Sequence, residues 1–490
     1  MRPLTELIRA CPFLLERPPP AASLTITGIT CDSRQVKPGF LFVALKGEKA
    51  DGVAFIPQAI AQGAAVVLCA QGVSAPSGIP VLYANNVRAA LAHLAAAFYG
   101  KQPRHMVAVT GTDGKTSTAD FYRQFWQLMG QRSASIGTLG IVGSAGELLY
   151  PGTHTTPDPV QLHRILGELA ADCDYVAMEA SSHGIDQHRL DGVTLEAAAF
   201  TNLTRDHLDY HKTDEAYFAA KAALFSRLLP LGKTAVLNQD DGRFAVLKDI
   251  CAARKHRIIG FGKQGGEFTI RELALLPHGQ RVMLSLFGKP YRLDVPLVGA
   301  FQTMNILAAL GLVVGAGGDM EKALAVVPKL KGVPGRLEPV AMLANGAAVC
   351  IDYAHTPAAL ANILRTLRPH TQNKLHVVFG CGGDRDAGKR PEMGKVASEL
   401  ADHVIVTDDN PRSEDPALIR RAIMAASPRA KEVADRRQAI YVALQALGAG
   451  DVLVIAGKGH EKTQTIGDKV MAFDDAEVAR AGVKELHLAA

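Results

Sequence analysis

The sequence predicts an α/β protein with mostly parallel sheets, divided into about three domains. From residue 106 onward, short apolar strands alternate with helix-patterned segments, a rhythm typical of parallel strands joined by crossover helices. One of those strands, residues 106–109, is followed by a glycine-rich loop and then by a helical pattern. The length of 490 residues also exceeds what one hydrophobic core usually supports.

Composition favours an α/β enzyme over a disordered or fibrous chain, since 48% of the residues are hydrophobic and 6% are aromatic. The net charge of +5 arises from 53 basic and 48 acidic residues that are mixed along the sequence. The sequence has no Lys/Arg run of the kind that follows a nucleic-acid backbone. We therefore expect no nucleic-acid partner.

The cysteines and the N-terminal residues predict a cytoplasmic protein. The 7 cysteines are scattered, without a C-x-x-C pair, and are expected to be reduced and mostly buried. Charged residues and the prolines at 18–20 interrupt any signal-peptide core. The longest apolar stretch, residues 306–317, is too short to span a membrane and is expected to form a buried helix.

The first two parts of the chain have distinct element patterns. Before the glycine-rich loop we expect strands at residues 24–29 and 39–45 and a helix at 87–99, followed by a linker at 100–104. After it we expect strands at 175–179, 197–201 and 234–237 and a helix at 214–229. The Gly/Pro-rich run at 332–336 closes this middle part.

The last part repeats the strand and helix rhythm, and each of its strands ends in a polar or glycine-rich loop. Strands are expected at residues 348–351, 375–379, 403–407 and 452–456. The loops that follow them are residues 352–355, 380–385, 408–412 and 457–461. Because ligands bind beyond the carboxyl ends of strands in open α/β sheets, these loops predict a ligand site.

The glycine-rich loop, residues 111–116, is here called the phosphate loop. Gly111 and Gly114 allow successive backbone N–H groups to face an anion, Lys115 adds a charge, and the Thr116 hydroxyl suits Mg²⁺. The common pattern has glycine where this chain has Val109, so the loop is a shortened variant. The alternative is a plain glycine turn, but the order of strand, loop and helix favours phosphate binding.

Two residues are candidate metal ligands. Glu179 ends a predicted strand, where a metal that bridges nucleotide phosphates needs a carboxylate. Taken alone it is more typical of a strand-end surface acid, but with a phosphate loop on a neighbouring strand the metal role is favoured. His207 is a weaker candidate, because a loop histidine is more often a hydrogen-bonded structural residue.

Lys221 falls on the apolar face of the helix predicted at 214–229, where lysine is rare. Desolvation there would lower its pKa and favour the neutral amine, which can react with carbon dioxide to give an anionic carbamate. The alternative is that the stem packs against the apolar face while the ammonium reaches water. Spacing alone favours this second interpretation.

Three charged residues end loops of the last part. Arg385 and Arg412 carry guanidinium groups suited to bidentate capture of a carboxylate, and Glu461 suits an ammonium group. Together they describe a pocket for a zwitterionic amino acid. Surface ion pairs are an equally good explanation on these residues alone.

These motifs, in this order, resemble the Mur ligase superfamily over nearly the whole chain. The motifs that carry the resemblance are residues 110–117, 154–157, 179–184 and 201–211, Lys221, Asn305, and residues 352–355 and 409–412. In the family, the tetrapeptide at 409–412 accompanies diaminopimelate as the added amino acid. This chain departs from the usual pattern by carrying Asp113 and His154 where relatives commonly have Asn.

The resemblance implies a three-domain fold: residues 1–102 for the uridine nucleotide, 103–334 as a central P-loop ATPase with a mostly parallel sheet, and 335–490 as a Rossmann-like domain for the amino acid. It implies addition of meso-diaminopimelate to UDP-N-acetylmuramoyl-L-alanyl-D-glutamate with ATP and Mg²⁺, in peptidoglycan precursor synthesis. A monomer is expected. Alternatives are a lysine-adding relative, a folylpolyglutamate synthase, a small-molecule kinase and a nucleotide-gated binding module.

The resemblance also implies roles for individual residues. Those expected to bind ATP are Gly111, Thr112, Asp113, Gly114, Lys115, Thr116, Ser117, Asn305, Arg336 and Asp352. Those expected to hold the uridine moiety are Cys31, Ser33, Glu48, Lys49 and Ala50, and those expected at the muramoyl dipeptide are His154, Thr155, Thr156, Ser181, Gln187 and Arg189. The diaminopimelate site is expected at Arg385, Asp409, Asn410, Pro411, Arg412, Gly457 and Glu461.

The catalytic set implied by the resemblance is Lys115, Lys221, Glu179 and His207. Metal binding is implied for Thr116, Glu179, His207 and carbamylated Lys221. This implication reverses the interpretation of Lys221 that spacing alone favours.

Overall fold

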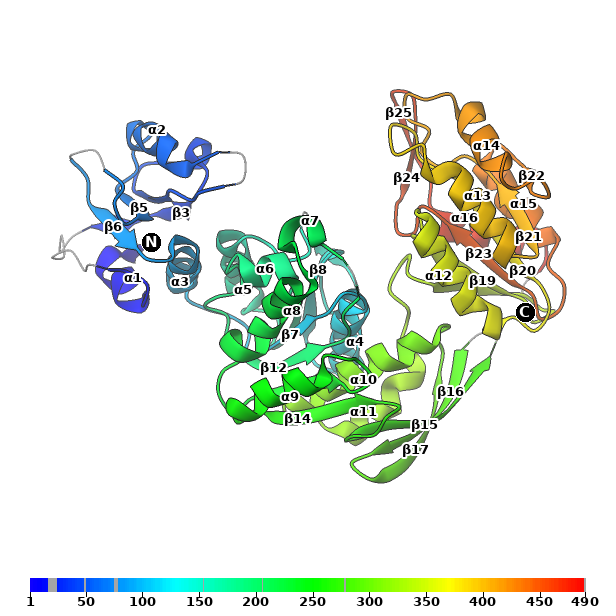
Figure 1. The fold of residues 1–490 in the computed structure, drawn as a ribbon, viewed down its shortest axis with the longest axis horizontal. Helices are drawn as coiled ribbons and strands as arrows, with labels where there is room; N and C mark the ends of the chain where they lie inside the picture. The colour runs from blue at the N-terminus through cyan, green and yellow to red at the C-terminus, as the bar shows by residue number, and fades with distance from the viewer. Residues whose placement is uncertain are drawn as a thin grey trace. The chain divides into compact units, whose positions relative to one another are not determined.

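The computed structural model describes residues 1–15, 24–47, 50–74, 78–152, 154–204, 206–276 and 279–488, which are traced in Figure 1. They form two compact units, Met1–Gly266 with Asn305–Ala323 and Glu267–Met304 with Leu324–Ala490. None of the described helices combines the length and the apolar character that crossing a bilayer requires. All seven cysteines are free, and Cys31 alone is exposed, so the prediction that most of the thiols are buried is confirmed.

The first unit begins with a parallel sheet of order β3-β4-β5-β6. The strands are β3 (Gly28–Thr30), β4 (Phe40–Val43), β5 (Val66–Ala70) and β6 (Val81–Ala84). Alternate side chains of these strands share one core with helices α1 (Leu4–Ala10) and α3 (Val87–Tyr99) and another with α2 (Ile56–Ala61). The helix predicted at 87–99 is confirmed. The strand predicted at 24–29 is interrupted, because β2 (Thr25–Ile26) pairs with β1 (Arg2–Pro3) instead.

The central sheet of the first unit has the order β10-β9-β8-β11-β7-β12-β13-β14, and β8, β11, β7, β12, β13 and β14 run parallel. The strands are β7 (His105–Thr110), β8 (Ser133–Gly137), β9 (Gly140–Val142), β10 (Leu148–Tyr150), β11 (Tyr175–Glu179), β12 (Leu195–Phe200), β13 (Thr234–Asn238) and β14 (Arg257–Gly262). Glu179 pairs with Val109, and Phe200 pairs with Thr110. Their carboxyl ends are therefore level with the start of the phosphate loop.

The helices of this region are α4 (Lys115–Leu128), α5 (Pro159–Leu169), α6 (Ser182–Asp186), α7 (Leu208–His211), α8 (Asp214–Ala223), α9 (Phe244–Ala253), α10 (Ala300–Gly315) and α11 (Met320–Val326). Apolar residues of α5, α8 and α9 share one core with the sheet. Helix α10 approaches the sheet through small residues, since a Cβ at Gly311 would lie 2.6 Å from Val236 Cγ1 of β13.

The helix predicted at 214–229 is not α-helical throughout. The α-helix α8 ends at Ala223, and a π-helical turn, Leu224–Leu228, follows it. The neighbouring side chains of Leu224 and Phe225 in this turn are both fully buried. An apolar pattern does not distinguish these two helical geometries.

The second unit contains an antiparallel meander and a parallel sheet. The meander, β15 (Phe268–Leu276), β16 (Gly279–Leu286) and β17 (Lys289–Val295), has no counterpart in the sequence prediction. The sheet has the order β18-β19-β23-β20-β21-β22, in which only β18 is antiparallel to its neighbour. Its strands are β18 (Glu338–Met342), β19 (Ala348–Asp352), β20 (Leu375–Phe379), β21 (His403–Val406), β22 (Lys431–Glu432) and β23 (Val452–Ala456).

Helices cover both faces of this second sheet, which gives an α/β/α sandwich (Figure 1). Helices α12 (Pro357–Leu367), α13 (Lys389–Leu400) and α14 (Pro416–Met424) share one core with the sheet, and α15 (Arg436–Gln445) and α16 (Asp475–Glu485) share the other. A hairpin of β24 (Thr463–Ile466) and β25 (Lys469–Ala472) follows β23. The α/β class with mostly parallel sheets is confirmed.

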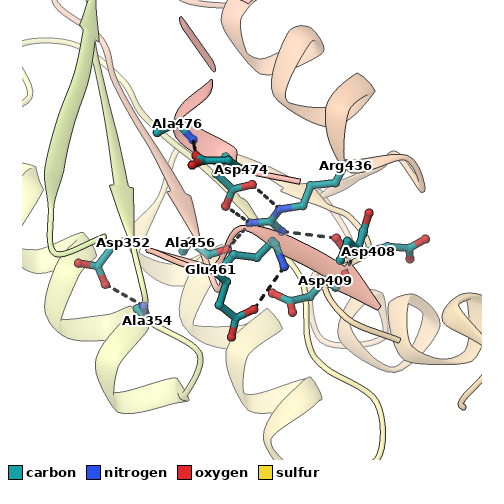
Figure 2. Close-up of polar contacts among 12 residues, drawn as sticks. Asp352, Ala354, Asp408, Asp409, Arg436, Ala456, Glu461, Asp474 and Ala476 are labelled. Carbon is teal, nitrogen blue, oxygen red and sulfur yellow. Dashed lines mark hydrogen bonds and ion pairs between the residues drawn. The ribbon is translucent and has the colours of Figure 1, made fainter. Parts of the chain in front are cut away.

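A buried ion pair joins the two helices on one face to the sheet. Arg436 begins α15 and Asp475 begins α16, and both side chains are fully buried. The Arg436 Nε and Nη2 atoms donate to the two Asp475 carboxylate oxygens, each at 2.7 Å, and Nη2 also donates to the Ala456 carbonyl at 3.0 Å. Figure 2 shows Arg436 next to the end of β23.

Replacing Arg436 by Leu is expected to destabilise the protein, because it leaves the Asp475 carboxylate buried and unpaired. Breaking a buried pair in this way costs about 3–5 kcal/mol of unfolding free energy. Urea unfolding of the full chain measures the change, with Arg437→Leu at the exposed neighbouring position as the control. The double variant Arg436→Leu/Asp475→Leu should be more stable than Arg436→Leu. Equal stability of the two Arg→Leu single variants would contradict this account.

Candidate active site

The phosphate loop connects β7 to α4 and needs glycine at both of its turns. Gly111 has a φ of +146°, and a Cβ there would lie 1.9 Å from Thr201 Oγ1. Gly114 has a φ of +83° at the N-terminus of α4, and a Cβ there would lie 2.3 Å from Asn305 Oδ1. The loop backbone therefore approaches β12 and α10 more closely than any side chain would permit.

Polar side chains hold this loop in position. The Lys115 ammonium donates to the carbonyl oxygens of Gly111 at 2.9 Å and Thr112 at 2.6 Å. The Asp113 N–H donates to Asn202 Oδ1, while the Asp113 carboxylate is on the exposed side of the loop. Thr116 and Ser117 follow in the first turn of α4, so the sequence-predicted phosphate residues form one continuous structure.

Glu179 ends β11 beside the phosphate loop, and its side chain is buried, with 2% exposure. Its Oε1 accepts from the Thr138 N–H at 2.8 Å, and its Oε2 accepts from the Thr138 hydroxyl at 3.3 Å. Burial raises the pKa of the Glu179 carboxyl, whereas the Lys115 charge and a hydrogen bond from Thr116 lower it. The interpretation as a surface acid is therefore wrong.

Lys221 is 1% exposed, so the interpretation in which its ammonium reaches water is also wrong. Its Nζ donates to the Gly111 carbonyl at 2.6 Å and lies 4.4 Å from the centroid of the Tyr217 ring. Desolvation, together with the nearby Lys115 charge, lowers the pKa of Lys221 to about 6. The neutral amine is thus the favoured form at neutral pH, directly beside the phosphate loop.

His207 is located on the segment between β12 and α8 and has a positive φ of +52°. Its side chain is 47% exposed, its Nε2 lies 3.4 Å from Asp206 Oδ2, and its ring is edge-on to His183. Within the described ranges, no three His, Cys, Asp or Glu side chains are grouped closely enough to hold a metal ion. The metal set of Thr116, Glu179, His207 and Lys221 stays a prediction.

A pocket of about 280 Å³ is located between the first sheet and the central sheet of the first unit. Its lining includes four residues predicted at the substrate: Cys31, His154, Gln187 and Arg189. It also includes Arg88 and Asp158, which sequence reasoning missed. Arg88 lies in the first turn of α3, the helix that follows β6. Its position just beyond the end of a strand could have identified it as a ligand-binding candidate.

Ser33 and Ala50, two further predicted uridine residues, are not among the residues that line this pocket. Ser33 is buried, and its hydroxyl donates to Gln58 Oε1 at 2.9 Å. Ala50 is exposed, and its carbonyl accepts from the Gly47 N–H. Glu48 and Lys49 lie outside the described residues.

The predicted muramoyl-dipeptide residues are hydrogen-bonded to one another and to the strand that carries Glu179. The Arg189 guanidinium donates to the Thr156 carbonyl at 2.8 Å and to Gln187 Oε1 at 2.7 Å. The Thr156 hydroxyl donates to the Glu179 carbonyl and lies 3.0 Å from Ser181 Oγ.

Thr138 connects this group to the phosphate loop region, because its hydroxyl contacts both Thr155 Oγ1 at 3.0 Å and Glu179. Sequence reasoning missed Thr138. Thr138 belongs to none of the sequence motifs, and only the parallel pairing of β8 with β11 brings it close to Glu179.

The second unit gathers the four predicted loops at the carboxyl edge of β19, β23, β20 and β21. The Gly383 N–H donates to the Asn410 carbonyl, and the Gly457 N–H donates to the Asp352 carbonyl. Gly457 has a φ of +116°, and a Cβ there would lie 2.5 Å from Asp409 Oδ2. The loops therefore form one connected group.

The charged residues of these loops differ in exposure and contacts. Arg412 has a φ of +52° and is half-buried, and its Nη1 donates to the Gly383 carbonyl at 2.7 Å. Pro411 before it is buried, whereas Arg385 is exposed. Glu461 accepts from Asn410 Nδ2 at 2.8 Å and lies 3.3 Å from Lys458 Nζ. Because Lys458 is buried, this contact is not a surface ion pair.

Asp352 and Arg336, which the resemblance assigns to ATP, are neighbours in the second unit. The Asp352 carboxylate accepts from the Leu337 and Ala354 N–H groups, each at 2.8 Å. Burial raises the pKa of Asp352, and these two hydrogen bonds lower it. The Arg336 guanidinium lies 5.4 Å from the centroid of the Tyr353 ring.

Three family models match the chain. They are described as Mur ligase family, catalytic domain (residues 25–99), Mur ligase middle domain (109–313), and Mur ligase, glutamate ligase domain (335–459). These matches agree with a fold of three Mur ligase domains, while the domain boundaries at 102 and 334 stay predictions.

Relatives that match over nearly their full length are named UDP-N-acetylmuramoyl-L-alanyl-D-glutamate--2,6-diaminopimelate ligase. The protein from Mesorhizobium japonicum is 52% identical over 95% of this chain and 96% of its own length. That from Rhizobium meliloti is 51% identical over 94% and 95%. A solved structure of a protein with this name superposes with a TM-score of 0.76 at 35% identity, covering 96% of this chain and 98% of that one.

The low pKa of Lys221 predicts a pH-dependent stability. Its pKa is about 6 in the folded protein against an ordinary value of 10.5, so between these values the unfolded chain binds the extra proton. Stability should therefore rise with pH across this range. In carbon dioxide-free buffer, the unfolding free energy of wild type relative to Lys221→Met should rise by up to about 1.4 kcal/mol per pH unit.

Urea unfolding at a series of pH values measures this slope. Lys248→Met, at an exposed position of α9, is the matched control and should show no such slope relative to wild type. Parallel stability profiles for wild type and Lys221→Met would contradict the assignment of a buried neutral amine.

Proposed function

Because the chain belongs to the Mur ligase family, we propose that it adds meso-diaminopimelate to UDP-N-acetylmuramoyl-L-alanyl-D-glutamate in an ATP-dependent step of peptidoglycan precursor synthesis. One geometric observation carries the chemistry of this proposal. The phosphate loop, the Lys115 ammonium and the buried Glu179 carboxylate lie at one strand edge, joined through Thr138 to the predicted muramoyl-dipeptide residues.

The reaction needs no enzyme nucleophile. The γ-carboxylate of D-glutamate attacks the γ-phosphoryl group of ATP, which releases ADP and leaves an acyl phosphate. The diaminopimelate amine then attacks the acyl carbon, and the tetrahedral intermediate collapses to an amide and inorganic phosphate as the amine loses a proton. Positioning and compensation of charge on the phosphoryl oxygens are the tasks left to the protein.

The chain offers groups for each task. The phosphate loop ends at the N-terminus of α4, where anions are stabilised. Lys115 supplies a positive charge at the same place. We also propose that Asn305, Arg336 and Asp352 contact ATP. Asp113 is proposed to act in place of the Asn that relatives commonly have at this position.

The donor set also fits Mg²⁺. Glu179 and the Thr116 hydroxyl provide oxygen ligands, and His207 provides a ring nitrogen. The neutral Lys221 amine can bond to carbon dioxide and lose a proton, which gives a carbamate with two oxygen atoms. When bound, Mg²⁺ would offset negative charge on the phosphoryl oxygens. We propose that these four residues hold it.

The two other substrates are proposed to use the remaining predicted residues. The pocket lined by Cys31, His154, Gln187 and Arg189 is proposed to take the uridine muropeptide. The loops that carry Arg385, residues 409–412, Gly457 and Glu461 are proposed to take diaminopimelate. The protein is further proposed to act as a cytoplasmic monomer.

Phosphate release tests this function. We expect inorganic phosphate to appear only when ATP, Mg²⁺, the uridine muropeptide and meso-diaminopimelate are all present. A kinase would form a phosphorylated product without the amine, and a binding module would release no phosphate. A lysine-adding ligase would accept lysine in place of diaminopimelate, and a folylpolyglutamate synthase would require a folate and glutamate.

Replacing Lys115 by Ala should reduce turnover on the order of 10²-fold or more, because charge on the transferring phosphoryl group loses its compensating cation. Initial rates of phosphate release measure this loss. Lys101→Ala, at an exposed position in the same unit, should keep wild-type rates. Near-normal turnover of Lys115→Ala would refute the phosphate-loop assignment.

Arg412 should determine the choice of amino acid. Diaminopimelate differs from lysine by a distal carboxylate, and Arg412 retains donors for that group beyond the one used by Gly383. Wild type should reject lysine by a factor of roughly 10² to 10⁴ in kcat/KM. Arg412→Ala should lose most of its kcat/KM for diaminopimelate while the KM values for ATP and muropeptide stay unchanged.

The exposed Arg421 of α14 offers a matched control, and Arg421→Ala should behave as wild type. If Arg412→Ala keeps the wild-type preference for diaminopimelate over lysine, the specificity assignment is wrong, although the ligase assignment would stand.

A further inference from the structure

Lys458 follows β23 between two glycines and has a fully buried side chain, with 0% exposure. Lysine is almost never buried to this extent without acceptors for its ammonium group. Here Nζ donates to the Thr463 carbonyl at 2.6 Å, to Asn410 Oδ1 at 3.2 Å and to Glu461 Oε2 at 3.3 Å. The three donors of the ammonium group therefore have three acceptors.

Two of these acceptors also contact each other. Asn410 Nδ2 donates to Glu461 Oε2 at 2.8 Å, so Lys458, Asn410 and Glu461 form a closed triangle. The Thr465 N–H donates to Asn410 Oδ1 at 3.0 Å, which fixes the direction of the amide. Glu461 consequently has one carboxylate oxygen, Oε2, held by two donors from different loops.

The triangle leaves the rest of the Glu461 carboxylate on the accessible side. The Glu461 side chain is 33% exposed, whereas the Lys458 side chain is fully enclosed. Figure 2 shows the Glu461 side chain near that of Asp409. A ligand that reaches Glu461 from solvent would therefore not touch Lys458.

We propose that Lys458 is a positioning residue for the incoming amino acid. Its buried ammonium holds Glu461 and Asn410 in the geometry in which Glu461 Oε1 receives an ammonium group of meso-diaminopimelate. This inference rests on the proposed function, and it assigns to Lys458 an effect exerted through Glu461. Replacing a residue that only supports the local fold would change stability without changing the KM for the amino acid.

Lys458→Met keeps a long unbranched side chain but removes the charge and the donors. Loss of a charged hydrogen-bond donor to Glu461 should raise the KM for diaminopimelate roughly ten- to a hundredfold. The kcat at saturating diaminopimelate and the KM for ATP should stay within about twofold of wild type. Lys462→Met, at the exposed lysine four residues further along, is the matched control and should leave every constant unchanged.

A double-mutant cycle with Glu461→Gln separates the positioning role from a local structural role. If Lys458 acts through Glu461, adding Lys458→Met to Glu461→Gln should raise the KM for diaminopimelate little further. If the KM increase of the double variant equals the product of the two single-variant increases, the proposal is overturned. An unchanged KM in the Lys458→Met single variant would also overturn it.

Should Lys458→Met fail to fold, Asn410→Asp tests the same triangle. This variant keeps Lys458 in place but replaces the donor amide at Glu461 Oε2 by a second carboxylate. We expect a similar rise in the KM for diaminopimelate, and an unchanged KM would overturn the proposal. Failure of the wild type to release phosphate with diaminopimelate would refute the proposed function instead.

Discussion

Parallel hydrogen bonding of β7 to β11 and β12 is the constraint on which the phosphate site depends. Parallel strands in register end at one edge, so the register that pairs Glu179 with Val109 brings a carboxylate level with the phosphate loop. The neighbouring pairing of Phe200 with Thr110 brings Thr201 against Gly111. Thr201, and Asn305 of α10, leave no room for side chains at Gly111 and Gly114. The same edge rule places the four loops of the second unit together.

Two buried lysines show how similar burial can serve different purposes. Lys458 is surrounded by a carbonyl, an amide oxygen and a carboxylate, so its charge is compensated in place. Lys221 has one carbonyl and a tyrosine ring, and the like charge of Lys115 is nearby. Burial then favours loss of its proton. The first arrangement holds neighbouring side chains, and the second favours a neutral amine at a cost in stability.

Local order in the sequence was enough to predict the phosphate loop, since strand, glycines, lysine and helix are consecutive. It was also enough for β20 and β23 and the loops that follow them. Lys221 was misjudged from spacing because its burial depends on Gly111, which is distant in the sequence. Thr138 and Lys458 were missed for the same reason. The meander of β15 to β17 was missed although burial alternates along most of β16, whereas β15 has no such alternation.

The division of the chain into units affects how the protein must fold during its synthesis. The first segment of the first unit ends at Gly266, and its second segment is Asn305–Ala323. The second segment supplies most of α10, including Gly311, which packs closely on β13. The meander of the second unit is translated between these two segments. Strand β13 therefore leaves the ribosome before the helix α10 that packs on it. It lacks this partner until the chain has been made past Ala323.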